Sequence, residues 1–294
     1  MRFTREWYFL DMLTLKWKNA YNKINMINIL KDLSMSSESI KNAVQQQFGN
    51  AAVAYANSPV HQKGADLTAM IDAAKPQAHW TILDAGCGAG HTGLAFAPYV
   101  AQVVASDFTP SMLVQVERLA AEKGLTNVST READAENLPF EDQSFDLVVS
   151  RLSAHHWPHP ETALREFARV LKPGSSFIVS DIVASEDYTA DTFLQTLELM
   201  RDPSHVRDYR VSEWTTFFQR AGFAPEVVLN YSIPLNFAAW LQRINTPPAH
   251  AQALRSLFTG AHAAMKELYH LPDQITDDEF EFVIHGAVLS GTKL

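Results

Sequence analysis

Short apolar runs alternate with amphipathic segments through the middle of the chain. The apolar runs are predicted strands, because each is brief and four of them end at an aspartate. The segments between them are predicted helices, and residues 160–171 place Leu164, Phe167 and Leu171 on one face. This alternation indicates a parallel sheet with crossover helices. The five predicted strands are WTILD (80–84), AQVVASD (101–107), NVSTREAD (127–134), FDLVVS (145–150) and SSFIVSD (175–181).

The pattern changes after residue 181. Residues 185 to about 275 are mostly helical in pattern, and residues 212–223 form one clear predicted helix. Two late strands are predicted, at residues 225–235 and 279–293. We expect the helical segments to form a cap over a cleft at the carboxyl ends of the parallel strands, where ligands bind in such sheets.

The first 35 residues differ in composition from the rest of the chain. They are polar and rich in asparagine, whereas the sequence after them is rich in alanine. A helix is predicted from Met35 onward. Two interpretations stay open: a native N-terminal helix, or an extension (1–35) before the main domain (36–294), with Met35 as a natural start.

Charge and cysteine content narrow the classes of function. The formal net charge is −9, and no basic stripe is present, which argues against a nucleic-acid surface. The single cysteine, Cys87, excludes a disulfide within the chain and a cysteine metal cluster, and it favours a reducing, cytoplasmic setting. No apolar run approaches the roughly 20 residues of a membrane span, and the first residues do not resemble a signal peptide.

The segment LDAGCGAGHTG (83–93) contains two overlapping glycine patterns. Gly86, Gly88 and Gly90 spell G-x-G-x-G, and the last two with Gly93 spell the dinucleotide pattern G-x-G-x-x-G. A pyrophosphate on this loop would lie close to the carboxylate of Asp84. S-adenosylmethionine has no phosphate and carries a positive sulfonium and ammonium, so Asp84 beside these glycines favours that cofactor over NAD.

Residues after the second and third strands complete the predicted cofactor site. Asp107 can accept both ribose hydroxyls, in either cofactor. Asp134 with Ala135 can meet the adenine amino group, and Phe108 and Met112 can pack on the adenine faces.

Four motifs in order give the chain a family resemblance. The segments ILDAGCGAG, VVASDFTPSML, READAENLPFEDQSFDLVVS and EFARVLKPGSSFIVSD resemble class I S-adenosylmethionine-dependent methyltransferases, most nearly the ubiquinone/menaquinone C-methyltransferase group. The resemblance covers roughly residues 48–182. It implies a Rossmann-like α/β fold with a seven-stranded, mostly parallel sheet whose last strand is antiparallel. It also implies that residues 45–67 tend to close over the cofactor.

The resemblance places the segment SRLSAHHWPHP (150–160) on the methyl-acceptor side. His155 or His156 can take a proton from the acceptor, and the rate would then fall as the pH drops through the pKa of that histidine, which is near 6.5 when unperturbed. The alternative is that one of them only bonds the loop backbone. Arg151 is assigned to the cofactor side, with pairing to a nearby acid as its alternative. A zinc site is disfavoured, and no metal is predicted.

Candidate acceptor contacts come from two further segments. Tyr55 and His61 can reach the methionyl end of the cofactor or the acceptor, or can simply pack the lid helix. In the cap, Arg207 and Arg210 lie in a charged stretch (201–210) that either contacts the acceptor or forms a solvated surface. Trp240 with Arg243 is a weaker candidate pair.

The function expected from these features is methyl transfer from S-adenosylmethionine to an oxygen or carbon atom of a small organic molecule. Two alternatives are an S-adenosylmethionine-binding protein without transferase activity and, disfavoured by Asp84, an NAD-type oxidoreductase. The sequence leaves a homodimer open.

Overall fold

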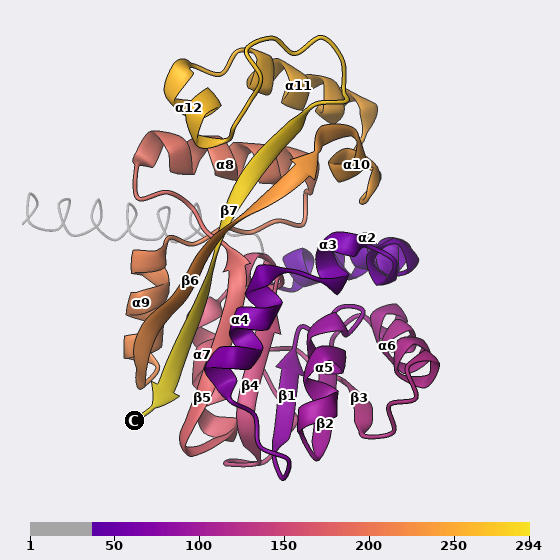
Figure 1. Ribbon diagram of the computed structural model, residues 1–294, viewed down its shortest axis with the longest axis vertical. Coiled ribbons are helices and arrows are strands. Elements are labelled where there is room, and N and C mark those ends of the chain that lie inside the picture. Colours follow the sequence, from indigo (N-terminus) through magenta and orange to yellow (C-terminus); the bar gives the residue numbers. More distant parts are fainter. Residues whose placement is uncertain (1–36) are drawn as a thin grey trace, which may run out of the picture. The chain divides into compact units, whose positions relative to one another are not determined.

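Seven strands form a single sheet in the order β3-β2-β1-β4-β5-β7-β6 (Figure 1). The computed structural model describes residues 37–294, so the predictions for residues 1–35 lie outside it. Strands β1 to β5 pair in parallel, and β7 is antiparallel to both β5 and β6. The predicted sheet is thereby confirmed. The strands are β1 (Thr81–Ala85), β2 (Gln102–Asp107), β3 (Val128–Glu132), β4 (Phe145–Arg151), β5 (Leu171–Ile182), β6 (Phe223–Asn236) and β7 (Glu281–Lys293).

Helices cover both faces of this sheet. Neighbouring strand residues point to opposite sides, so their apolar side chains form one core on each face. Ile82 belongs to the core beneath α4 (Ala65–Ala74) and α5 (His91–Phe96). Its neighbour Leu83 belongs to the opposite core, beneath α7 (Pro160–Val170) and α9 (Val211–Arg220). Helix α6 (Pro110–Glu122) packs on β2, β3 and α5. It begins at Pro110, whose fixed φ suits the first turn of a helix, and it is followed by Gly124 at a φ of +68°.

A cap of four helices covers the long ends of β6 and β7 (Figure 1). Its core contains Trp240, Phe258 and Phe282, with ring centroids of the last two 4.9 Å apart. The predicted helix at residues 212–223 is not part of the cap, since it is α9 and packs on the sheet. The cap helices are α8 (Tyr188–Arg201), α10 (Phe237–Gln242), α11 (Pro248–Thr259) and α12 (Ala263–Leu268).

The chain reverses direction across the sheet at β1, and this creates the site. From β1 it moves outward to β2 and β3, and it then returns to β4 on the other side of β1. The carboxyl ends of β1 and β4 therefore bound a crevice of the kind that holds ligands in such sheets. Helices α2 (Ser37–Ala56) and α3 (Pro59–Gln62) precede α4 in the chain.

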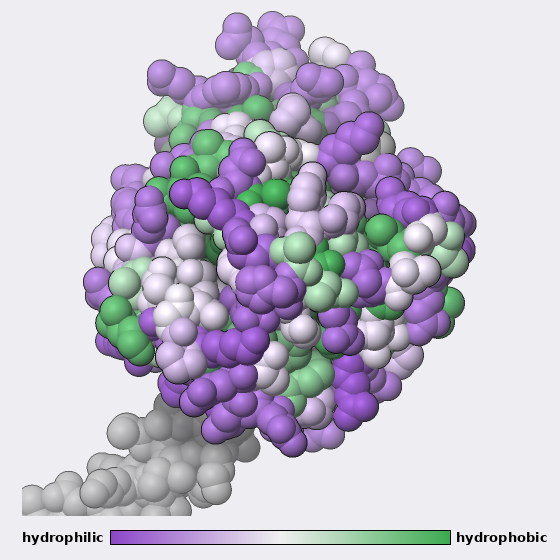
Figure 2. All heavy atoms as spheres, turned by 60° about the horizontal axis from the view of Figure 1, so that its bottom comes forward, coloured by the Kyte–Doolittle hydropathy of each residue, from purple (hydrophilic) through white to green (hydrophobic). Residues whose placement is uncertain are grey.

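The surface offers less guidance to function than the crevice. On the face shown in Figure 2, hydrophobic residues lie scattered among hydrophilic ones, which is ordinary for a protein surface. Within residues 37–294, no helix has the length and apolar character that crossing a membrane requires.

Candidate active site

The loop between β1 and α5 contains three glycines with a positive φ, Gly86, Gly88 and Gly90, and two of them also make close contacts. Gly86 and Gly90 have φ angles of +64° and +84°, in the left-handed region that favours glycine. A Cβ added at Gly86 would lie 2.2 Å from the Ser153 Oγ, and one at Gly90 would lie 2.8 Å from a methyl group of Val116. Gly86 therefore lets the loop approach the segment after β4, and Gly90 lets α5 begin close against α6.

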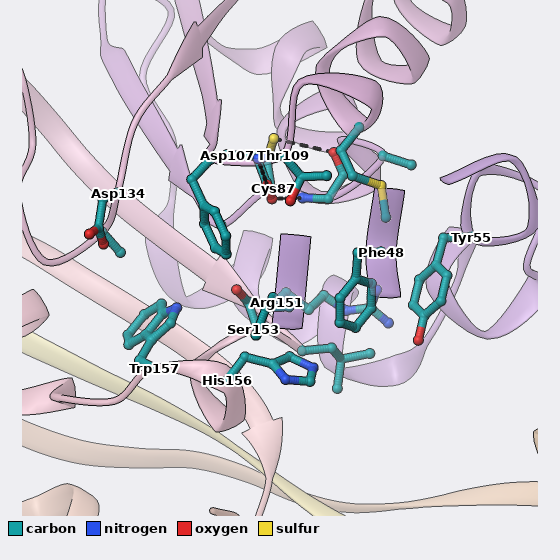
Figure 3. A pocket seen from close by; sticks show the side chains of 18 of the residues that line it. Phe48, Tyr55, Cys87, Asp107, Thr109, Asp134, Arg151, Ser153, His156 and Trp157 are labelled. Carbon is teal, nitrogen blue, oxygen red and sulfur yellow. Dashed lines mark hydrogen bonds between the residues drawn. The ribbon is translucent and has the colours of Figure 1, made fainter. Parts of the chain in front are cut away.

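A cavity of about 920 Å³ opens beside this loop (Figure 3). Most of the residues predicted on the cofactor side line it: Gly86, Gly88, Asp107, Phe108, Met112, Asp134, Ala135 and Arg151. Two predicted residues, Asp84 and Gly90, do not.

Asp84, predicted to bind the cofactor, lies behind the loop and does not line the cavity. Its side chain is buried, and its Oδ2 accepts a hydrogen bond of 2.7 Å from the Gly93 N–H. Burial raises the pKa of the Asp84 carboxyl to about 7, although the Gly93 amide acts in the opposite direction. Asp84 thus fixes the start of α5 and shapes the loop from behind.

Asp107 faces the cavity from the end of β2. Its Oδ2 accepts a hydrogen bond from the Gly88 N–H at 2.9 Å, and its Oδ1 accepts one from the Thr109 N–H at 2.8 Å. These bonds tie the glycine loop to the start of α6. Each carboxylate oxygen has a second lone pair for a ligand hydroxyl. Phe108 and Met112, on the same segment, supply apolar wall.

Asp134 lies at another part of the wall and is held by a lysine. Lys41 Nζ donates to Asp134 Oδ2 at 2.6 Å and to Glu136 Oε2 at 2.7 Å. Asp134 Oδ1 accepts the Glu136 N–H at 2.9 Å. The lysine charge is therefore shared between two carboxylates, and little of it is left for a ligand.

Arg151 lines the cavity, but its charge is already paired. Its Nε donates to Asp66 Oδ2 at 2.5 Å, and both side chains are only 4% exposed. A second bond of 2.8 Å runs from Nη1 to the carbonyl of His61. The structure therefore supports the alternative reading of Arg151, as the partner of a nearby acid that also positions the segment around His61.

A second cavity, of about 540 Å³, lies beneath the cap and adjoins the first. The two share a wall formed by Phe48, Tyr55, His61, Leu152 and His156. Figure 3 shows the Phe48 ring between Tyr55 and His156. Its centroid lies 5.1 Å from that of Tyr55 and 4.8 Å from that of His156. Tyr55 and His61, predicted as acceptor contacts, thus lie at the boundary between the cavities.

The two adjacent histidines have opposite protonation states. Burial alone would lower the pKa of His155, but the Asp181 carboxylate, 2.7 Å from its Nδ1, raises it to about 9. Burial lowers the pKa of His156 to about 4, and the charge of His155, with ring centroids 4.3 Å apart, acts in the same direction. At neutral pH His155 is therefore a cation and His156 is neutral, and both pKa values differ from the unperturbed 6.5.

The tautomer of His156 follows from its hydrogen bond. Its Nδ1 lies 3.2 Å from the carbonyl oxygen of Ser204. Since a carbonyl only accepts, Nδ1 carries the proton and Nε2 keeps a lone pair. The nearest acid to Nε2, Asp202, is 4.0 Å away, beyond hydrogen-bond distance. His156 therefore presents a free base, whereas His155 lines only the second cavity.

Arg207 and Arg210, predicted as acceptor contacts, line neither of these two cavities. Both guanidinium groups contact the carboxylate of Asp191, that of Arg207 at 2.8 Å. Two other cap residues, Arg201 and Arg243, line the second cavity together with Trp240. Arg243 with Trp240 was the weaker candidate from the sequence.

Several lining residues escaped the sequence analysis. Ser153 and Trp157 flank the two histidines, and their place in that loop was the available signal. Nothing in the sequence near Lys41 indicates its place in the site, because its partner Asp134 lies 93 residues away. Glu198 reaches the second cavity from α8, whose pattern shows only that the helix is amphipathic.

The charges of the first cavity fit a cationic ligand better than a pyrophosphate. Lys41 and Arg151 are both paired with acids. Asp107 has no cationic partner among residues 37–294 that would neutralise it for a phosphate. A ligand with ribose hydroxyls and a positive sulfonium matches these groups, so the residues fit S-adenosylmethionine.

Comparisons with known proteins point to the same chemistry. The family model described as "Methyltransferase domain" matches residues 83–179, from the glycine loop into β5. The uncharacterized methyltransferase YcgJ of Bacillus subtilis (strain 168) is 34% identical over 246 residues, which is 84% of this chain and 97% of that protein. Its crystal structure covers 78% of this chain and 97% of its own, with a TM-score of 0.75.

Two further proteins extend this likeness. A putative methyltransferase from Bacillus halodurans C-125 is 29% identical, with a TM-score of 0.74 over 78% of this chain and 99% of that one. The ubiquinone/menaquinone biosynthesis C-methyltransferase UbiE of Bartonella tribocorum is 39% identical over 104 residues, 34% of this chain and 40% of that protein.

Proposed function

The chain belongs to the class I S-adenosylmethionine-dependent methyltransferases, and we propose that it methylates an oxygen or carbon atom of a small organic molecule. The two adjoining cavities with a common wall support this proposal. The first carries the residues that fit the cofactor. The second lies beneath the cap, which contributes Glu198, Arg201 and Trp240 to its lining.

Different residues of the first cavity bind different parts of the cofactor. S-adenosylmethionine, when bound, supplies a methyl group on a positively charged sulfur. In this proposal Asp107 accepts the ribose hydroxyls, and Phe108 and Met112 pack on the adenine. Asp134 and Ala135 bind the adenine edge. The glycine loop leaves the backbone open to the rest of the molecule.

The residues shared by the two cavities remove a proton from the acceptor and align it with the cofactor. His156 offers the lone pair of Nε2 to a proton of the acceptor, a role for a neutral imidazole. Phe48, Tyr55 and Leu152 exclude water and hold the acceptor in line, and alignment of this kind supplies much of the rate in a displacement reaction.

Cofactor binding gives a direct test of the first cavity. We expect S-adenosylhomocysteine to bind in calorimetry and NADH not to bind. The Asp107→Ala variant should bind S-adenosylhomocysteine about 1–3 kcal/mol more weakly, because hydrogen-bonding partners are left unmatched. Asp72→Ala, which removes an exposed acid from α4, is the control and should bind normally. NADH binding more tightly than S-adenosylhomocysteine would contradict the assignment.

The proposed acceptor class is tested by labelling. The full chain is incubated with S-adenosylmethionine labelled on its methyl group and, separately, with small-molecule, protein and RNA fractions of a cell extract. Label should enter the small-molecule fraction as S-adenosylhomocysteine accumulates. Label in protein or RNA alone would overturn the acceptor class. Cofactor binding without any S-adenosylhomocysteine would favour a binding protein without transferase activity.

A further inference from the structure

Arg243, just after α10, is the cation of the second cavity that lacks an ionic partner. Its side chain is half-buried, and within residues 37–294 its guanidinium forms neither a salt bridge nor a hydrogen bond. Burial lowers the pKa of Arg243, and the charge of Arg201 acts in the same direction, whereas Tyr55 and Glu198 act in the opposite direction without forming a salt bridge to it. An arginine nevertheless stays charged in a protein. A partly buried charge without a partner is costly, so a ligand that pairs with it gains affinity.

Arg201, the other arginine of this cavity, is already satisfied. Its Nη1 lies 3.4 Å from Glu198 Oε2, and its Nε donates to the Trp240 carbonyl at 3.2 Å. The guanidinium carbon also lies 4.8 Å from the centre of the Trp240 ring, within cation–π distance. Arg201 therefore neutralises Glu198, and the positive charge of Arg243 is left over.

The other ionisable groups on this wall do not cancel that charge. Burial raises the pKa of the Asp208 carboxyl well above its usual range, and its side chain is only 1% exposed, so burial disfavours its charged form. His155 is a cation, but its charge is matched by Asp181. Among the charged residues that line this cavity, Arg201 and His155 each have an acidic partner within 4 Å, and Arg243 has none among residues 37–294.

Most of the remaining wall is apolar. It consists of Leu152, Ile182, Ile233, Leu235, Ile284 and the rings of Phe48 and Trp240. A ligand that fills the cavity must therefore combine an apolar body with an anionic group near Arg243.

We propose that Arg243 binds a carboxylate of the methyl acceptor, and that the acceptor is an otherwise apolar monoanion. The planar guanidinium fork matches a carboxylate with two hydrogen bonds. A single unpaired cation beside Glu198 suits one negative charge better than the two of a phosphate monoester. This inference rests on the proposed function, since it assigns the second cavity to the acceptor.

Matched ligand pairs test the charge preference without knowledge of the acceptor. Protein saturated with S-adenosylhomocysteine is titrated with 3-phenylpropionate and its amide, and with hexanoate and its amide. At least one carboxylate should bind about tenfold or more tightly than its amide, the scale of a charged hydrogen bond. Arg243→Gln should abolish this preference, and Arg243→Lys should keep part of it. Equal affinities within both pairs, or no carboxylate binding, would overturn the proposal.

Two controls separate charge from folding. Arg220→Gln removes an arginine that is 64% exposed at the end of α9 and should leave the preference intact. Normal binding of S-adenosylhomocysteine shows that each variant is folded. If Arg243→Gln does not fold, Arg243→Lys still tests the role of the charge.

Anion exchange of the small-molecule extract distinguishes this inference from the proposed function. The fraction retained by the resin should accept labelled methyl groups, and Arg243→Gln should raise the KM for that fraction. Labelling of the unretained fraction alone would overturn the anionic acceptor and leave methyl transfer standing. If neither fraction accepts labelled methyl groups, the result counts against the proposed function. The titrations of carboxylates and amides then show independently whether Arg243 binds a carboxylate.

Discussion

Replacing His156 with alanine should lower the rate of methyl transfer by about 10²–10⁴-fold, the usual contribution of a general base. The imidazole lies in the wall between the two cavities and has a free Nε2 lone pair. S-adenosylhomocysteine affinity should stay nearly unchanged, because the ring supplies only part of one wall. The measurement is the initial rate of S-adenosylhomocysteine formation with the acceptor fraction found by labelling.

His159→Ala is the matched control, since His159 is an exposed histidine three residues further along the same segment. It should keep full turnover. Full turnover in His156→Ala as well would show that alignment alone carries the reaction.

The pH profile identifies which histidine acts. With a pKa of about 4, His156 stays unprotonated from pH 6 upward, so a rate that depends on it should not fall between pH 8 and 6. His155 has a pKa of about 9, and a rate that needed it as a base would rise as the pH increases through that value. Comparison with the profile of His156→Ala removes the ionisation of the acceptor itself.

Asp66→Ala should lower the free energy of unfolding by about 3–5 kcal/mol, the cost of removing one member of a buried ion pair. Asp66 on α4 is the carboxylate partner of Arg151 at the end of β4, and it also accepts a bond of 3.1 Å from Ser180 Oγ. Without it a buried guanidinium loses its counter-charge. Urea denaturation without cofactor gives the difference.

Asp72→Ala on the same helix is exposed and should change the free energy of unfolding by less than about 0.5 kcal/mol. A double variant, Asp66→Leu with Arg151→Met, should recover part of the loss, because replacing both partners removes the unpaired charge. A loss for Asp66→Ala no larger than that of Asp72→Ala would show that the pair contributes little.

The sheet was predictable because its signals are local. Most of the parallel strands are short apolar runs followed by a helix pattern, so the order of elements follows from adjacent residues; β3 is the exception, since it is polar and leads to β4 without a helix. The position of α9 was not predictable in the same way. Its pattern shows an apolar face, but only the folded chain shows that Trp214 and Phe218 pack with Phe223 on the sheet rather than in the cap.

In the site too, the residues that could be predicted are those whose roles follow from their neighbours in the sequence. Asp107, Phe108 and Met112 follow one strand directly, and the structure places all three on the wall of the first cavity. The sequence could not show which arginines between residues 201 and 243 line the second cavity. Arg207 and Arg210 instead bond Asp191, which lies at least 16 residues earlier in the chain. The two histidines differ because Asp181, from β5, bonds His155 alone.

The most direct test of the two-cavity account is a crystal structure of the protein with S-adenosylhomocysteine and the methylated product. The account predicts S-adenosylhomocysteine against Asp107 and the glycine loop, and the product beneath the cap with its new methyl group beside His156. A product bound outside the cavity lined by Trp240 and Arg243 would contradict it.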